Sequence, residues 1–546
     1  MVEVIRKKGF LYFIDFYKII NFLFFAACLF FMKMLALFFL HERAENIGLS
    51  NILYKLYSVT LTVLFVAVWI LVFWYNSTNK TYFFRTGRNL RYDSTHFRRS
   101  IKELTEYFRD ADTRRLDVDA LPEISWQDAS GLVFGKSNNR LIGYRPKKNG
   151  ICTFVWGAPG DGKTTSVIIP SCRQFGLFRN KDGNLIQRGS VMVTDLKGDI
   201  YEANKKYRRI KRFSTVHWQE SAHYDPLYNS RSIKKENRAI FLENLAFTII
   251  PNEQSADAKY FVDGARDFFT GITLYLLNKD NEISFPCIIE QIVVGNFADW
   301  VIEIKNSDDT LAKSYTNHFY GENEKNVSGI YSKLVSCTRL FSTEIMKKLL
   351  VNDEDSISPA NLEHGIDIYI QVDPNQIALM APVIAMLYQD FMSAMLYRSE
   401  GQQPPIAFVL DEFGQLPAMP VIEQSAALLR AYNCSLMLCC QSLSMLDKRY
   451  GIEGRKLLLD CAKVHCFLSI MDPDTRDWAS RLFGSRKVLK ISNNENDTSS
   501  GRTVSEAKEN VFDPEEFGDL PNNDELLVYC FGKYIRAEKT YYFLDN

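Results

Sequence analysis

The sequence predicts an α/β protein whose sheet is mainly parallel, interrupted by an all-α segment and preceded by two transmembrane helices. Three observations favour this fold class. The first 80 or so residues contain two long apolar runs. The remainder alternates short apolar runs with amphipathic stretches, which is the pattern of strands and helices in a parallel sheet. Between Pro286 and about Leu350 that alternation gives way to helix-like periodicity.

The two apolar runs cover Ile19 to Leu40, whose one charged residue is Lys33, and Tyr57 to Tyr75, which has no charge. About twenty residues at roughly 1.5 Å rise span a hydrocarbon core of about 30 Å. One lysine costs at most about 3 kcal/mol and can extend to the interface, so the neighbouring Leu and Phe residues offset it. A cleaved signal peptide is the alternative, but no small-x-small cleavage site follows the first run.

Basic residues give the two spans an orientation. The loop between the spans contains only Arg43 and Lys55. Basic residues cluster before the first span, at Arg6, Lys7 and Lys8, and again after the second, at Lys80, Arg85, Arg88, Arg91, Arg98 and Arg99. By the positive-inside rule, both ends of the chain are predicted to be cytoplasmic.

After a basic connector that extends to about Ala120, near-continuous apolar runs predict strands buried on both faces. The predicted strands are Ile151 to Trp156, Ser190 to Thr194, Ile366 to Val372, Ile406 to Leu410, Cys434 to Cys440 and Val464 to Ile470. Near the C-terminus, Asn493 to Asn510 is polar and predicts an exposed loop.

Composition adds little to the assignment of function. Of the 546 residues, 47% are hydrophobic and 24% charged, and the formal net charge is zero, so charge neither supports nor excludes a nucleic-acid partner. The 11 cysteines include no C-x-x-C pair and no histidines at metal-ligand spacing. We interpret them as buried, reduced thiols.

The residues that follow the first predicted strand of the soluble part match the phosphate-binding motif G-x-x-x-x-G-K-[ST]. They are Gly157, Ala158, Pro159, Gly160, Asp161, Gly162, Lys163 and Thr164, followed by Thr165 at the start of a predicted helix. The glycines let backbone N–H groups surround phosphate, and the helix adds its positive end. Lys163 would reach the β and γ phosphates of ATP, and Thr164 would ligate Mg²⁺. A plain glycine turn is the alternative.

The predicted strand Ile406 to Leu410 is followed by two adjacent carboxylates, Asp411 and Glu412. Asp411 at the strand end would hold the magnesium shell, and Glu412 would orient and deprotonate the attacking water. The second acid favours hydrolysis over transfer of phosphate to an acceptor. An acidic turn without chemistry is the alternative for the pair.

Two further polar residues flank the next predicted strand. Gln441 at its end suits a sensor of the γ phosphate, and Arg430 before its start suits an arginine that acts on the site of a neighbouring subunit. The alternatives are a strand-end glutamine and a surface arginine without a role in catalysis.

Together these residues resemble the type IV coupling protein family, the hexameric ATPases of conjugative DNA transfer and type IV secretion. The family-specific strings are Asp195-Leu-Lys197-Gly198-Asp199 and Leu410-Asp411-Glu412-Phe413-Gly414-Gln415-Leu416-Pro417, beside Gln441-Ser442 and the stretch from Pro514 to Phe543. The sequence departs from the family pattern in the phosphate loop, which lacks the usual threonine, and at Asp199, where glutamate is usual.

This resemblance implies a RecA-like core with an inserted all-α domain, in a homo-hexamer at the bacterial inner membrane. It implies Lys163, Thr164, Asp411 and Glu412 as the catalytic set with ATP and Mg²⁺, Gln441 as sensor and Arg430 as finger. Asp195 and Lys197 receive no chemical role. The implied partners are single-stranded DNA linked to a relaxase or processing complex, and the membrane proteins of the secretion channel.

The predicted divisions of the chain follow from these motifs. They are a transmembrane region over 1–80, a cytoplasmic connector and the start of the nucleotide-binding domain over 81–150, the first part of that domain over 151–285, an all-α domain over 286–350, and the second part over 351–546.

Three alternatives stay open at the level of sequence. Another P-loop secretion ATPase or DNA translocase would share the two nucleotide motifs and Gln441, although it would usually lack the Asp195 to Gly198 string. A coupling protein could also carry protein effectors without DNA, and a membrane scaffold could bind nucleotide without hydrolysing it. The basic run Lys205 to Arg212 could contact DNA phosphates or form a solvated helix face.

Overall fold

A computed structural model of the chain describes residues 59, 124–125, 131–137, 140–144, 149–179, 185–253, 256–399, 404–496 and 499–544. The predicted spans over 19–40 and 57–75 lie outside the described residues, but for Val59, as does the basic connector. The chain divides into two compact units, one of residues 1–113 and 486–509, the other of 114–485 and 510–546. Almost everything described below lies in the second unit.

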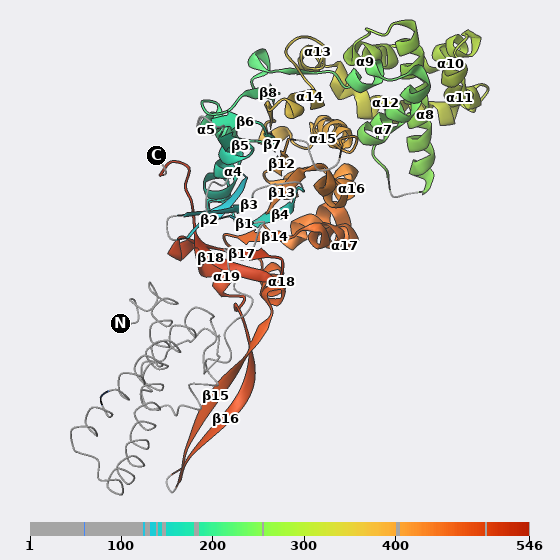
Figure 1. Ribbon diagram of the computed structural model, residues 1–546. Helices are drawn as coiled ribbons and strands as arrows, with labels where there is room; N and C mark the ends of the chain where they lie inside the picture. The colour runs from blue at the N-terminus through green and yellow to red at the C-terminus, as the bar shows by residue number, and fades with distance from the viewer. Residues whose placement is uncertain are drawn as a thin grey trace, which may run out of the picture. The chain divides into compact units, whose positions relative to one another are not determined.

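The described residues of this unit form a twelve-stranded mixed sheet (Figure 1). Its order is β1-β3-β2-β18-β17-β14-β4-β13-β12-β7-β11-β8. The parallel strands are β14 (Val464–Phe467), β4 (Cys152–Trp156), β13 (Cys434–Cys440), β12 (Ile406–Leu410), β7 (Ser190–Thr194), β11 (Asp367–Gln371) and β8 (Ile210–Ser214). The six strands expected from apolar runs are therefore confirmed, and β8 extends them.

An antiparallel part, which the sequence analysis did not predict, continues the sheet beyond β14. It consists of β17 (Glu525–Cys530), β18 (Lys533–Glu538), β2 (Leu132–Ser137), β3 (Arg140–Tyr144) and β1 (Ile124–Ser125). The end of the chain, which follows β18, is thereby brought to the β14 side of β4.

Alternate residues of the parallel strands enter two separate cores, as the pleat of a strand requires. In β12, Ile406, Phe408 and Leu410 join one apolar cluster, and Ala407 and Val409 join the other. The two cores explain why these strands read as continuous apolar runs, since neither face of the strand meets water.

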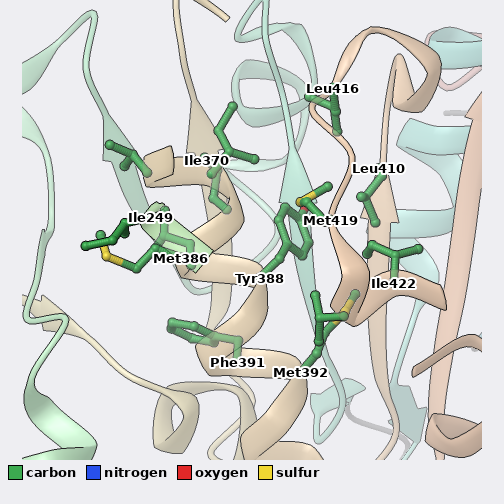
Figure 2. Close-up of a cluster of buried hydrophobic side chains, with 14 of the residues drawn as sticks. Ile249, Ile370, Met386, Tyr388, Phe391, Met392, Leu410, Leu416, Met419 and Ile422 are labelled. Atoms are coloured by element: carbon green, nitrogen blue, oxygen red, sulfur yellow. The ribbon is translucent and has the colours of Figure 1, made fainter. Parts of the chain in front are cut away.

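Different helices contribute to the two clusters. The larger cluster contains side chains of α15 (Ala381–Met395), α16 (Pro420–Leu428) and α17 (Leu443–Cys461), and the smaller contains those of α4 (Ile169–Gln174) and α5 (Asp199–Asn204). Figure 2 shows Tyr388, Phe391 and Met392 of α15 in the larger cluster, together with Ile370 and Leu410 of the sheet.

Helices follow one another between β9 (His223–Tyr224) and β10 (Ser356–Ile357) without an intervening strand among the described residues. They include α6 (Tyr228–Ser232), α7 (Arg238–Ile249), α8 (Ala256–Lys279), α9 (Phe285–Val294), α10 (Phe297–Asn306), α11 (Thr310–Thr316), α12 (Glu324–Thr338) and α13 (Glu344–Leu349). Helices α7 to α12 gather together in Figure 1, and α8 packs against α7, α11 and α12. The predicted all-α segment 286–350 falls within this run, and its boundaries as a domain stay a prediction.

The described residues contain no single helix that is both long enough and apolar enough to cross a membrane. The pair α9 and α10 meets that test jointly, by length and composition, although the two helices are bent by 116° from each other.

The prediction of an exposed loop over Asn493 to Asn510 is wrong. The structure has a two-stranded sheet there, formed by β15 (Ser485–Asn496) and β16 (Ser499–Asn510). Two strands joined by two residues can pair only antiparallel, and their backbone groups then bond to each other. Such a ribbon needs few of the apolar residues that the segment lacks, so composition misled the prediction.

Candidate nucleotide-binding site

The sheet register brings the predicted site residues to one edge. Cys440 of β13 lies opposite Trp156 of β4, and Leu410 of β12 lies opposite both Leu438 of β13 and Thr194 of β7. All four strands are parallel, so the residues after their carboxyl ends meet at the same edge of the sheet. The phosphate-binding loop, Asp411, Gln441 and Asp195 are these residues.

The loop between β4 and the next helix has the backbone that its glycines predict. Gly160 and Gly162 have φ values of 90° and 88°, a left-handed conformation that favours glycine. A Cβ on Gly157 would lie 2.9 Å from Cγ of Lys163, so a side chain at that position would displace Lys163. A π-helical turn over Thr164–Ile168 leads directly into α4, and the loop therefore ends at the amino end of a helix.

Lys163 is buried and lies against its own loop. Its Nζ donates to the carbonyl oxygens of Gly157, at 2.8 Å, and Ala158, at 3.3 Å. The ammonium group is thereby held at the loop, where an anion would meet it. Pro159 and Gly160 are exposed, and the Thr165 hydroxyl donates to the Gly162 carbonyl at 3.3 Å.

Asp161 ties the loop to the neighbouring strand. Its Oδ2 accepts from the Ala158 N–H at 3.0 Å and from the Ser469 hydroxyl, and Ser469 Oγ also accepts from the Ala158 N–H at 3.0 Å. Ser469 follows β14, the strand beside β4. The sequence analysis missed Ser469, because only the order of the strands places it beside the loop.

A chain of hydrogen bonds links the loop to the acidic pair. The Thr164 hydroxyl donates to Asp411 Oδ2 at 3.2 Å, and the Glu412 N–H donates to Asp411 Oδ1 at 2.9 Å. Glu412 Oε2 then accepts from Gln441 Nε2 at 2.9 Å and from Gln415 Nε2 at 3.0 Å. The structure therefore brings Thr164, Asp411, Glu412 and Gln441 into direct contact.

Burial changes the pKa of Asp411, the first acid of the pair. It raises the pKa of Asp411 to about 6, and the neighbouring Glu412 charge acts in the same direction. Glu412 has a φ of 51°, which is uncommon for a residue with a side chain and is typical of functional sites.

Asp195 has a structural task that the sequence did not reveal. Its two carboxylate oxygens accept from the N–H groups of Gly198, at 2.9 Å, and Tyr201, at 2.7 Å, and so shape the turn into α5. Burial raises the pKa of Asp195 to about 6 despite these bonds. Lys197 is exposed beside it.

Arg430 does not reach this site within the chain. It is exposed on a short helical turn, Leu429–Tyr432, and its carbonyl accepts from the Gly150 N–H at 2.9 Å. It thus lies at the amino ends of β4 and β13, whereas the loop and Gln441 lie at their carboxyl ends. The seven residues of β13 separate the two ends, at about 3.3 Å per residue.

The basic run Lys205 to Arg212 is not a solvated helix face. It passes from a turn into β8, and several of its cations bond within the chain. Arg208 forms a buried ion pair with Asp367, Lys211 donates to the Ser356 carbonyl and Arg212 pairs with Glu220.

The end of the chain contributes residues that sequence reasoning left without a role. The Tyr542 N–H donates to the Thr165 carbonyl at 3.2 Å. Cε1 of Tyr541 would lie 3.5 Å from a Cβ built on Gly162. Only the position of β18 in the sheet brings these residues to the loop.

The donor set fits a nucleotide with Mg²⁺. The described residues contain no group of three or more His, Cys, Asp or Glu side chains that could hold a metal ion alone. They do place the Thr164 hydroxyl on the Asp411 carboxylate, and Mg²⁺ is usually held by one or two such oxygen ligands together with substrate phosphates.

Comparison with known proteins gives consistent similarities. Residues 122–546 match the family model described as type IV secretory system conjugative DNA transfer. Protein VirD4 of Agrobacterium fabrum is 23% identical over 447 residues, which cover 76% of this chain and 62% of that protein. A conjugal transfer protein TraG of Escherichia coli is 21% identical, over 71% of this chain and 61% of its own length. The chain thus spans less than two thirds of these relatives.

Solved structures show the same fold. The plasmid coupling protein TrwB, in complex with the non-hydrolysable ATP analogue ADPNP, superposes with a TM-score of 0.56 at 15% identity, over 73% of this chain and 90% of that chain. TrwB in complex with ADP and Mg²⁺ gives a TM-score of 0.54 at 17% identity, over 71% and 84%. The described core therefore has the mixed α/β fold of TrwB.

Proposed function

The chain belongs to the family of type IV secretory system proteins for conjugative DNA transfer, and from this membership we propose that it is a membrane-anchored ATPase coupling protein. In this role it recruits a DNA-relaxase substrate and drives its transfer through a type IV secretion channel. The observation that carries the proposal is the hydrogen-bonded chain from Thr164 through Asp411 and Glu412 to Gln441, directly beside the phosphate-binding loop.

Each part of the site has a task in this proposal. Bound Mg²⁺–ATP supplies the phosphoanhydride whose hydrolysis drives transport. The loop from Gly157 to Gly162 offers backbone N–H groups to the phosphates, and Lys163 offers its ammonium group. Thr164 and Asp411 offer the oxygen ligands for Mg²⁺. That TrwB is known in complex with ADPNP and with ADP and Mg²⁺ supports this assignment of cofactors.

Glu412 is the proposed general base, and Gln441 positions it. The carboxylate accepts hydrogen bonds from the side-chain amides of Gln441 and Gln415, which fix its orientation at the edge of the sheet. An oriented carboxylate that accepts a proton from water contributes typically about 10² to 10⁴ in rate. Because Gln441 contacts the proposed general base, it is also placed to act as the sensor of the γ phosphate.

The proposed assembly, membrane location and partners rest on family membership. We propose a homo-hexamer at the inner face of the bacterial cytoplasmic membrane, with the spans 19–40 and 57–75 as anchors and both termini cytoplasmic. Arg430 would act in trans, on the site of a neighbouring subunit. The proposed partners are relaxase-linked single-stranded DNA, the relaxase or processing complex, and the channel proteins.

The hydrolysis step can be tested on the full-length chain in mild detergent, by measuring phosphate release from Mg²⁺–ATP. We expect Lys163→Ala to lose nucleotide binding, and Glu412→Gln to bind ATP while hydrolysing it about 100-fold more slowly. Lys448→Ala, at an exposed position on α17, is the matched control and should hydrolyse ATP like the unmodified chain. Hydrolysis that persists in both site variants would refute the assignment.

A further inference from the structure

The last described residues, 539–544, which we call the C-terminal segment, lie against the phosphate-binding loop. The Tyr542 N–H bonds to the Thr165 carbonyl at 3.2 Å, and the Tyr541 ring lies beside Gly162. Lys539 and Thr540 are buried, whereas Phe543 is 55% exposed. The segment therefore places aromatic side chains beside the phosphate-binding loop, and one of them, Phe543, is exposed to solvent.

Anchors on two sides fix this segment in place. On one side, the Tyr541 hydroxyl donates to Asp524 Oδ1 at 2.6 Å, and the Lys539 N–H donates to the Asp524 carbonyl at 3.0 Å. On the other side, the Arg173 guanidinium donates to the Tyr542 carbonyl at 3.3 Å and lies 5.4 Å from the centre of the Tyr542 ring. Arg173 belongs to α4, the helix that continues from the loop.

The sheet order separates the acids from these aromatics. Asp411, Glu412 and Gln441 follow β12 and β13, which lie on one side of β4. The C-terminal segment follows β18, which lies on the other side, beyond β14 and β17. A nucleotide whose γ phosphate points to Glu412 must direct its ribose and base away from the acids. The opposite flank of the loop is where the C-terminal segment lies.

The two ring systems on that flank suit a flat ligand. The rings of Tyr541 and Phe543 are stacked, with centroids 5.3 Å apart and planes 27° apart. The hydroxyl bond to Asp524 fixes the first ring, and the exposed second ring offers a face to solvent. Stacking of a base on an aromatic side chain is tolerant of base identity, because every base has a π face.

We propose that the C-terminal segment forms the base-binding side of the nucleotide site, with the purine base stacked on the Tyr541 and Phe543 pair. This inference rests on the proposed nucleotide site and adds to it the recognition of the nucleoside. Because stacking carries little information about the edge of the base, the site should bind ATP and GTP with similar affinity.

The test compares ligands that share phosphates and differ in the base. Binding of ATP, GTP and inorganic tripolyphosphate to the full-length chain in detergent is measured by calorimetry with Mg²⁺ present. We expect the double variant Tyr541→Ala/Phe543→Ala to bind ATP and GTP about ten-fold more weakly, in line with the stacking of one base. Its affinity for tripolyphosphate should change less than about two-fold, because that ligand has no base to stack.

Three further variants keep the result interpretable. Phe543→Ala alone removes an exposed ring, so it should fold normally and still weaken ATP binding by about three-fold. Tyr541→Phe keeps the ring for stacking and loses only the bond to Asp524, so it should weaken ATP binding less than the double variant does. Val294→Ala, an exposed apolar position on α9 outside the segment, is the matched control and should leave all three affinities unchanged.

Either of two results would overturn the inference. One is a double variant that binds ATP as tightly as the unmodified chain. The other is an equal loss of affinity for ATP and tripolyphosphate, which would mean that the segment only shapes the loop. The proposed nucleotide site fails separately, if Lys163→Ala leaves the binding of ATP and tripolyphosphate unchanged.

Discussion

At the proposed site, the negative charge of Asp411 lowers the stability of the folded chain. Asp411 is half-buried, lies next to Glu412 and accepts hydrogen bonds from the Thr164 hydroxyl and from the backbone. A carboxylate in this position is costly until a cation arrives, and a proposed ligand of Mg²⁺ has that property. Residues at functional sites often reduce stability for this reason.

The raised pKa of Asp411 gives a prediction about stability. Its folded value, about 6, exceeds the ordinary value of 3.8, so the folded chain holds the proton more tightly than the unfolded chain. Its contribution is then most favourable below pH 4 and is lost as the pH rises through 6, by at most about 3 kcal/mol. Asp411→Asn should therefore raise the thermal midpoint of the nucleotide-free chain at pH 7.5, and the difference should shrink toward pH 4.

Asp308→Asn, at an exposed position, is the matched control for that melting experiment and should not shift the midpoint. A variant at Asp411 that melts below the unmodified chain at pH 7.5 would show that the carboxylate is stabilising, contrary to the account.

Single residues also show where sequence reasoning reached its limit. The spacing of Gly157 to Thr164 and the pair Asp411 and Glu412 could be read directly, because each motif is contiguous. Ser469 and Tyr541 could not, because strand order alone brings them to the loop. Asp195 stood out in the sequence, but its bonds to Gly198 and Tyr201 depend on the turn into α5.

At the scale of elements, a buried ion pair joins several parts of the sheet. Arg208 Nε lies 2.6 Å from Asp367 Oδ2, and its second nitrogen lies 2.8 Å from Oδ1, with both side chains fully buried. Asp367 also accepts from the Val191 N–H at 2.9 Å, and Arg208 donates to the Phe175 carbonyl at 2.6 Å. The pair therefore ties β11 to β7 and to the end of α4.

Removing one partner should be worse than removing both. Arg208→Ala leaves a buried carboxylate without its cation, which costs typically about 3 to 5 kcal/mol. We expect Arg208→Met combined with Asp367→Leu to destabilise the chain less than Arg208→Ala does, as measured by the thermal midpoint. Lys206→Ala, an exposed neighbour, is the control. A double variant less stable than the single one would contradict this view of the pair.

The same elements explain which strands could be predicted. The parallel strands β4, β7, β12 and β13 have both faces buried and therefore read as continuous apolar runs. In β18, Lys533, Arg536 and Glu538 interrupt the apolar residues, and only part of the strand is buried. A strand that meets water on one face carries this mixed pattern, so β18 gave no clear signal in the sequence.

At the scale of the whole molecule, the proposed role of Arg430 requires an assembly. It lies at the opposite edge of the sheet from the loop, so it cannot serve the site of its own chain. In the proposed hexamer it would serve a neighbour. This predicts that Arg430→Ala and Lys163→Ala are each inactive alone and that a mixture of the two regains part of the ATPase activity, because some interfaces then combine an intact loop with an intact arginine.

Phosphate release from the mixed variants, assembled from separately purified chains, measures this complementation. The control is a mixture of Lys163→Ala with Glu412→Gln. Each of these chains has a defect in its own nucleotide site, so no interface contains an intact site and the mixture should stay inactive. Equal activity in the two mixtures would argue against a role of Arg430 in trans.

Whether the chain is a motor that acts on DNA can be measured through the effect of DNA on its ATP hydrolysis. The full-length chain in mild detergent is assayed with single-stranded DNA, with double-stranded DNA and without DNA, at low and high salt. For a DNA motor we expect DNA to stimulate hydrolysis. The stimulation should disappear in Lys163→Ala and weaken as salt rises, since phosphate contacts are lost with salt. Basal hydrolysis that DNA leaves unchanged at every salt concentration would contradict a DNA motor and would favour a protein cargo.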